Sequence, residues 1–210
     1  MSSKIPSDEI LPSRPPRSGE VGRIVALTGG IGSGKSYVCR LIHEAGFPVF
    51  YCDDEAKRII RTSPEVRRQL QALVGEEVYD GSVLSKAVLA AYICQGKDYA
   101  AKVDAIVHPA VAAAFRGWAA SQASPRVFME CALLFESGFD RLADTTVLVH
   151  APLEEKVKRV MARDGVSRAK VLDWIALQMP ESEKAARADA VILNDGKVEL
   201  APQIAPFVNL

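Results

Sequence analysis

Short apolar segments alternate along the chain with longer segments in which apolar residues recur every three or four positions. The short segments are typical of strands covered on both faces of a parallel sheet, and they occupy residues 23–28, 48–52, 127–130, 145–149 and 190–193. Helical spacing is found in residues 35–45, 63–122, 152–163 and 167–177. This alternation predicts an α/β fold, with a parallel sheet flanked by helices.

The longest helical stretch, residues 63–122, exceeds what a connection between two parallel strands requires. Turn and helix-stop residues interrupt it, namely Gly75, the Asp80-Gly81 pair and Gly96. We therefore expect a separate helical substrate lobe over residues 63–124 and a small helical lid over residues 153–177. The nucleotide-binding core is expected in residues 21–62, 125–152 and 178–210. Residues 1–20, with four prolines and five serines, are predicted to form a mobile extension.

Length and composition narrow the class of protein. The 210 residues suffice for one α/β domain with inserted subdomains or for two small domains. The 26 basic and 26 acidic residues balance, so we expect no nucleic-acid or membrane partner, and only a local basic patch stays open. The four cysteines form no C-x-x-C pair and only three histidines are present, which predicts reduced thiols in a cytoplasmic protein without structural zinc. The sequence does not set the oligomeric state.

A glycine-rich loop lies between the first predicted strand and the first predicted helix. It matches the phosphate-binding pattern G-x-x-x-x-G-K-S, and its residues, with the one that follows, are Gly29, Gly30, Ile31, Gly32, Ser33, Gly34, Lys35, Ser36 and Tyr37. Glycines let successive backbone N–H groups converge on phosphate oxygens, and the helix adds its positive N-terminal end. Lys35 then reaches the β- and γ-phosphates, while the Ser36 hydroxyl helps to hold Mg²⁺. The sequence thus predicts a site for ATP and Mg²⁺.

Other interpretations of the loop are weaker. A chance match is disfavoured because a strand precedes the motif and a helix follows it. A dinucleotide loop of the G-x-G-x-x-G type fails, because counting from Gly30 places Lys35 where the third glycine belongs. A GTPase would need Asn-Lys-x-Asp, which the sequence lacks, and motor ATPases are usually larger. A small chain with a helical insert and a basic helix pair fits a kinase for a small acceptor.

Asp53 follows the second predicted strand, at the sheet edge where ligands of open α/β sheets collect. A carboxylate there could accept the proton of an acceptor hydroxyl as it attacks the γ-phosphate, and we predict this role for Asp53. The alternative is that Asp53 or Asp54 caps the following helix, and for Asp54 the cap is preferred.

A basic segment, residues 154–170, carries Arg159 and Arg163 four residues apart on one predicted helix face. Arginines on a mobile element can close over a polyphosphate and neutralise its developing charge. A solvated basic face would show the same pattern. The phosphate loop favours the functional interpretation.

Several motifs in this order resemble the dephospho-coenzyme A kinase family, whose members are P-loop kinases. The resemblance runs from about residue 24 to residue 194 and rests on residues 27–36, residues 48–57, Asp80-Gly81, His108-Pro109, residues 133–136, Arg159, Gln178 and residues 188–194. It implies ATP-dependent phosphorylation of the ribose 3′-hydroxyl of dephospho-coenzyme A, the last step of coenzyme A synthesis. It also implies a P-loop core, a helical substrate lobe and a lid.

The resemblance assigns roles to single residues as well. Asp53 matches the family's proposed base, Arg159 matches a lid arginine, and Asn194 falls near the ATP adenine. Three residues are expected at the substrate, namely His108, Glu130 and Leu133. His108 could equally pack between helices, and Glu130 could either pack at a strand end or steer substrate or Mg²⁺ through water.

The sequence departs from the family pattern at Tyr51, where many relatives have an aspartate two residues before the base. Two other functions share the remaining motifs. A nucleoside or nucleotide kinase would use the same loop and lid with a different acceptor, and a P-loop regulator would bind ATP without turnover. We expect phosphorylation of dephospho-coenzyme A, with Asp53, Lys35 and Arg159 as catalytic residues and Arg163 in the ATP site.

Overall fold

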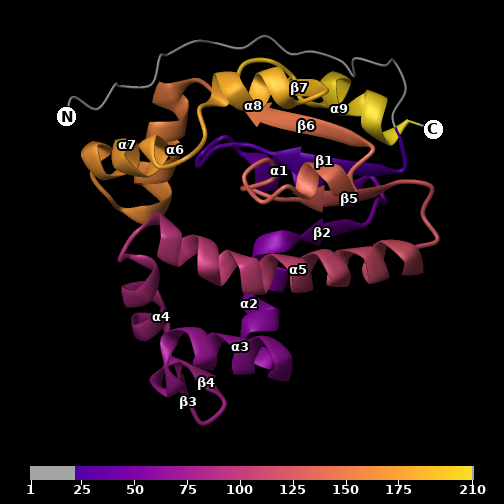
Figure 1. Ribbon diagram of the computed structural model, residues 1–210. Coiled ribbons are helices and arrows are strands. Elements are labelled where there is room, and N and C mark those ends of the chain that lie inside the picture. Colours follow the sequence, from indigo (N-terminus) through magenta and orange to yellow (C-terminus); the bar gives the residue numbers. More distant parts are fainter. Residues whose placement is uncertain (1–21, 210) are drawn as a thin grey trace. The chain divides into compact units, whose positions relative to one another are not determined.

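The computed structural model describes residues 22–209, and the predicted extension of residues 1–20 lies outside this part of the chain. The chain divides into two compact units (Figure 1). The first, the sheet unit, contains residues 22–50 and 122–209, and the second, the helical unit, contains residues 51–121. Within residues 22–209 no helix combines the length and the apolar character needed to cross a membrane.

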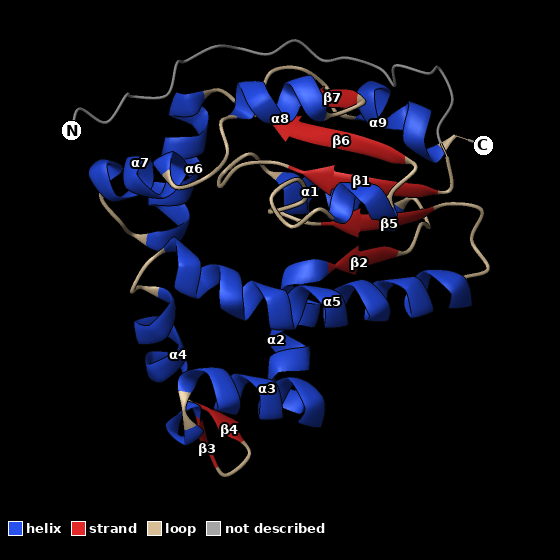
Figure 2. Ribbon diagram, in the orientation of Figure 1, coloured by secondary structure: helices blue, strands red, loops and turns tan. Residues whose placement is uncertain are grey.

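The sheet unit is built on one sheet of five strands in the order β2-β5-β1-β6-β7 (Figure 2). The strands are β1 (Ile24–Thr28), β2 (Val49–Tyr51), β5 (Val127–Glu130), β6 (Thr145–His150) and β7 (Ala190–Leu193). β1 lies at the centre and pairs in parallel with β5 and with β6, which in turn pairs in parallel with β7. Each strand agrees with its predicted range to within one residue at each end. The predicted parallel α/β sheet flanked by helices is confirmed.

Helices that cover the sheet bury their apolar stripes against it. α1 (Lys35–Glu44) buries Val38, Cys39 and Ile42 and packs against β1 and β5. α8 (Glu181–Arg187) packs on β6, and α9 (Ala201–Val208) packs on β7 and α1. Neither α8 nor α9 was predicted. Pro180 directly precedes the first residue of α8.

The predicted lid corresponds to α6 (Leu153–Asp164) and α7 (Arg168–Ala176). The two helices share a small apolar cluster made of Leu153, Val157, Val160 and Val171. Ile31 of the phosphate loop packs against this cluster.

The helical unit contains α2 (Cys52–Thr62), α3 (Pro64–Val74), η1 (Glu76–Val78), β3 (Tyr79–Asp80), β4 (Val83–Leu84), α4 (Lys86–Ile93) and α5 (Lys97–Ser121). It begins at residue 51, before the predicted start of the lobe at residue 63, because α2 packs against α3 and α5. The Asp80-Gly81 turn was predicted, but the hairpin of β3 and β4 around it was not. Two paired residues in each strand are too few to show an alternating pattern.

Candidate active site

The phosphate loop connects β1 to α1 and depends on two glycines. Gly32 and Gly34 have φ values of 79° and 84°, in the left-handed region that favours glycine. A Cβ on Gly32 would lie 2.6 Å from the carbonyl oxygen of Lys156, and one on Gly34 would collide with the Asn194 amide. Both backbone conformation and available space therefore require glycine at these positions.

The carbonyl side of the loop is held by Arg159 and Asn194. Asn194 Nδ2 donates to the carbonyl oxygen of Ser33 at 2.9 Å. The Arg159 guanidinium donates to the carbonyls of Gly32 and Ser33, each at 3.4 Å, and to the carbonyl of Asn194 at 3.0 Å. These bonds occupy backbone acceptors only, so the loop N–H groups that would face phosphates are not used by either side chain.

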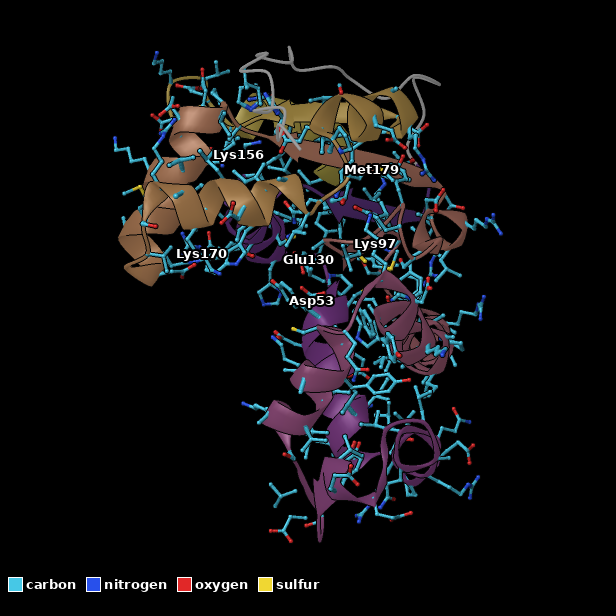
Figure 3. The ribbon with its side chains drawn as sticks, turned by 60° about the vertical axis from the view of Figure 1, so that its left-hand side comes forward. Asp53, Lys97, Glu130, Lys156, Lys170 and Met179 are labelled. Carbon is cyan, nitrogen blue, oxygen red and sulfur yellow. The ribbon has the colours of Figure 1, made fainter. Side chains whose placement is uncertain are left out.

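Lys35, in the first turn of α1, forms an ion pair with Glu130 at the end of β5 (Figure 3 labels Glu130). Both side chains are nearly buried, with 12% and 7% of their surfaces exposed. The pair is adjacent to the loop because β1 and β5 are neighbours, with Leu27 opposite Glu130. Lys35, the lysine predicted to contact phosphates, therefore lies beside the loop, and the Glu130 carboxylate balances its charge.

Cys39 lies one helical turn after Lys35 and is buried. Burial, and next the negative charge of Glu130, raise the pKa of this thiol to about 12, while Lys35 acts in the opposite direction. At pH 8 a thiol with this pKa is ionised to only about one part in 10⁴.

We therefore predict that iodoacetamide at pH 8 alkylates the exposed Cys94 in the native protein and leaves Cys39 unmodified. Peptide mass spectrometry after digestion measures both sites in one sample. Unfolding in guanidinium chloride before alkylation should make the two residues equally reactive. Equal labelling of both in the native protein would contradict the prediction.

Comparison with known proteins identifies the family. The sequence profile of the dephospho-CoA kinase family matches residues 23–199. The chain belongs to the dephospho-CoA kinase family. The Bacteroides fragilis (strain YCH46) dephospho-CoA kinase is 42% identical over 185 residues, which cover 88% of this chain and 90% of that protein. A Thermus thermophilus dephospho-CoA kinase is 40% identical over 176 residues, covering 84% of this chain and 85% of that protein.

Solved structures share the fold of this chain. A crystal structure from Thermus thermophilus superposes with a TM-score of 0.79 at 37% identity, covering 90% of this chain and 97% of that chain. The dephospho-CoA kinase from Campylobacter jejuni gives a TM-score of 0.62 at 22% identity, covering 88% and 93% of the two chains, and supports the fold alone.

The remaining candidate residues of this family member come from several elements. Arg163 is exposed near the end of α6 and donates from Nε to Asp164 at 2.7 Å. Leu133 is 41% exposed in the loop after β5. His108 belongs to the helical unit, where Nε2 lies 3.5 Å from Asp104 on the preceding turn of α5.

Asp53 also belongs to the helical unit, in the first turn of α2, and it is exposed. The cap of α2 is Tyr51, and no side chain caps this helix end. The alternative in which Asp53 or Asp54 caps the helix is therefore wrong. Asp54 instead forms an ion pair with Lys57 at 3.0 Å, one turn further along α2.

Several residues around the phosphate loop of this dephospho-CoA kinase family member were not predicted from the sequence. Gln178 was singled out only as a family motif, and its Oε1 accepts a hydrogen bond from the Ile31 N–H at 2.9 Å. Three buried residues with basic side chains had no assigned role, namely His150, Lys156 and Lys184. The one available signal was His150, a polar residue that directly ends the apolar run of β6.

Proposed function

We propose that the chain transfers the γ-phosphoryl group of ATP to the ribose 3′-hydroxyl of dephospho-coenzyme A, giving coenzyme A and ADP. The observation that carries this proposal is the complete phosphate loop, with Lys35 paired to Glu130, in a chain that matches the dephospho-CoA kinase family over residues 23–199. The reaction would take place in the cytoplasm, in agreement with cysteines that form no disulfide in the part of the chain that the structure describes.

ATP is proposed to bind with its phosphates on the loop of residues 29–37. Lys35 would exchange Glu130 for the β- and γ-phosphates, so that its charge stabilises the group in transfer. Asn194, buried beside the loop, would complete the adenine side of the site. The released Glu130 carboxylate would then face the reacting groups, in agreement with its predicted contact with substrate.

The residues present fit a Mg²⁺ ion. Ser36 is exposed in the first turn of α1, and a hydroxyl ligand beside nucleotide phosphates and water meets the preference of Mg²⁺ for oxygen. When bound, Mg²⁺ would supply positive charge that stabilises the phosphates. Ser36 would hold it, and Lys35 would contact the phosphates from the protein side.

Acceptor activation is assigned to Asp53, whose carboxylate would take the proton of the 3′-hydroxyl as the oxygen attacks phosphorus. Arg159 and Arg163 on α6 are proposed to neutralise charge on the polyphosphate. Arg159 would do so by giving up its bonds to the loop carbonyls, and Arg163 by leaving Asp164. His108 and Leu133 are proposed to contact dephospho-coenzyme A.

ADP release by the purified protein with Mg-ATP tests the proposal directly, with dephospho-coenzyme A, adenosine and AMP as separate acceptors and a reaction without acceptor as control. We expect turnover with dephospho-coenzyme A alone. Turnover with adenosine or AMP instead would retain the kinase mechanism and overturn the acceptor. ATP binding without turnover on any acceptor would indicate a regulator.

A further inference from the structure

The helix α8 (Glu181–Arg187) carries two charged side chains whose ends are withdrawn from solvent. The Glu181 side chain is 15% exposed, and that of Lys184 is completely buried. A buried charge is unfavourable unless it is paired and hydrogen-bonded, so each of these side chains should have specific partners. Glu181 pairs with residues of β6 and α6 and lies against the phosphate loop, whereas Lys184 bonds to the loop after β5.

Glu181 contacts the phosphate loop. A Cβ on Gly30 would lie 2.7 Å from Glu181 Oε1, so the carboxylate packs directly on the loop backbone. The carboxylate is itself held at 2.5 Å by His150 Nδ1 and at 2.9 Å by Lys156 Nζ (Figure 3 labels Lys156 on α6). Together with the bond from the Ile31 N–H to Gln178, this fixes the second and third residues of the loop.

Glu181 is held as an anion. Burial alone would raise the pKa of its carboxyl group, but the hydrogen bond with His150 and the charges of Lys156 and His150 outweigh burial and lower the pKa below its usual value. The contact with Gly30 is therefore made by a carboxylate whose position is set by two partners, on β6 and on α6.

Lys184, three residues further along α8, contacts the loop that follows β5. Its Nζ donates to the carbonyl of Ala132 at 3.1 Å and pairs with Glu136 at 3.0 Å. The same Ala132 carbonyl accepts a hydrogen bond at 3.3 Å from the hydroxyl of Thr28, the last residue of β1 before the phosphate loop. The loop from residue 131 to residue 136, the acceptor loop, contains Leu133.

We propose that α8 sets the spacing between the phosphate loop and the acceptor loop, with Glu181 as a positioning residue for ATP and Lys184 as a positioning residue for the acceptor. The second half of this inference rests on the proposed function, which assigns Leu133 to the acceptor. Phosphoryl transfer requires the attacking oxygen and the γ-phosphate to be held in line, and small displacements are strongly unfavourable to the rate. One short helix that packs against the phosphate loop and is bonded to the acceptor loop supplies that constraint.

Two single variants separate this role from a general effect on folding. Glu181→Gln keeps the size of the side chain and weakens its bonds to His150 and Lys156. We expect it to raise KM for ATP fivefold to tenfold and to change KM for dephospho-coenzyme A by less than twofold. Lys184→Met should raise KM for dephospho-coenzyme A fivefold to tenfold and change KM for ATP by less than twofold. Glu183→Gln, at an exposed position of the same helix, is the matched control and should leave both constants within twofold.

Thermal melting accompanies each kinetic measurement, because Lys184→Met leaves the Glu136 carboxylate without its lysine. If that variant does not fold, the double variant Lys184→Met/Glu136→Gln removes both charges, and it should fold and still show the raised KM for dephospho-coenzyme A. Parallel changes of both KM values in the two single variants would overturn the proposal. A lowered melting temperature with both KM values unchanged would overturn it as well.

Binding of a non-hydrolysable ATP analogue gives a readout that does not depend on the acceptor. Fivefold to tenfold weaker binding to Glu181→Gln, with unchanged binding to Lys184→Met, supports the ATP half of the proposal even if wild-type protein fails to phosphorylate dephospho-coenzyme A. Equal affinity of wild-type protein and Glu181→Gln overturns that half, whatever the acceptor is.

Discussion

Replacing Asp53 with asparagine is expected to lower kcat about a thousandfold while KM for ATP changes by less than twofold. General-base catalysis contributes roughly 10²- to 10⁴-fold to such reactions. The amide keeps the shape of the carboxyl group but cannot accept the proton of the 3′-hydroxyl. Asp53 is exposed and does not cap α2, so the substitution should leave the fold intact. Steady-state rates of ADP formation, with each substrate varied in turn, measure both constants.

Asp54→Asn is the matched control, because Asp54 is the next residue, is also exposed and pairs with a nearby residue of the same helix, Lys57. It should retain kcat within twofold. Undiminished turnover by Asp53→Asn would remove Asp53 from the base role. Equal loss in the two variants would point to the charge of this helix end rather than to proton transfer at Asp53.

The strands of the sheet unit could be predicted closely because burial on both faces imposes a nearly continuous apolar run. β5 and β7 start and end at the predicted residues, and β6 extends one residue further, to His150. The start of the helical unit could not be predicted in the same way. It depends on the packing of α2 against α5, two helices that are far apart in the sequence. The local pattern of each helix is that of any amphipathic helix.

The candidate site shows the same contrast between local signals and contacts that are distant in the sequence. The phosphate loop is a local signal, because the glycines, Lys35 and Ser36 are consecutive and their chemistry follows from their spacing. The residues that hold the loop come from distant parts of the chain: Gln178 bonds to Ile31 and Asn194 to Ser33.

The helix α8 is the clearest case of a site element without a local signal. Its sequence, Glu-Ser-Glu-Lys-Ala-Ala-Arg, has the charge pattern of a solvated helix. Only the three-dimensional structure distinguishes the partly buried Glu181 and the buried Lys184 from the exposed Glu183.

Replacing Lys35 with methionine is expected to lower kcat by a factor of about 10² to 10³, because a preorganised charge at the transferring group is lost. The same change leaves Glu130, which is 7% exposed, without its partner. Removing one member of a buried ion pair typically destabilises a protein by about 3–5 kcal/mol, so a lowered melting temperature is expected as well. Loss of activity by this variant could thus arise from chemistry or from stability.

The double variant Lys35→Met/Glu130→Gln separates the two causes. A neutral pair in place of the ion pair should recover most of the lost melting temperature, because no uncompensated charge remains buried. It should not recover kcat, because Lys35 is proposed to act on the phosphates and not only on Glu130. Lys158→Met, at an exposed position of α6, controls for the loss of one positive charge and should keep both properties. Recovery of kcat together with stability in the double variant would show that Lys35 serves the fold alone, and would contradict its assignment to phosphoryl transfer.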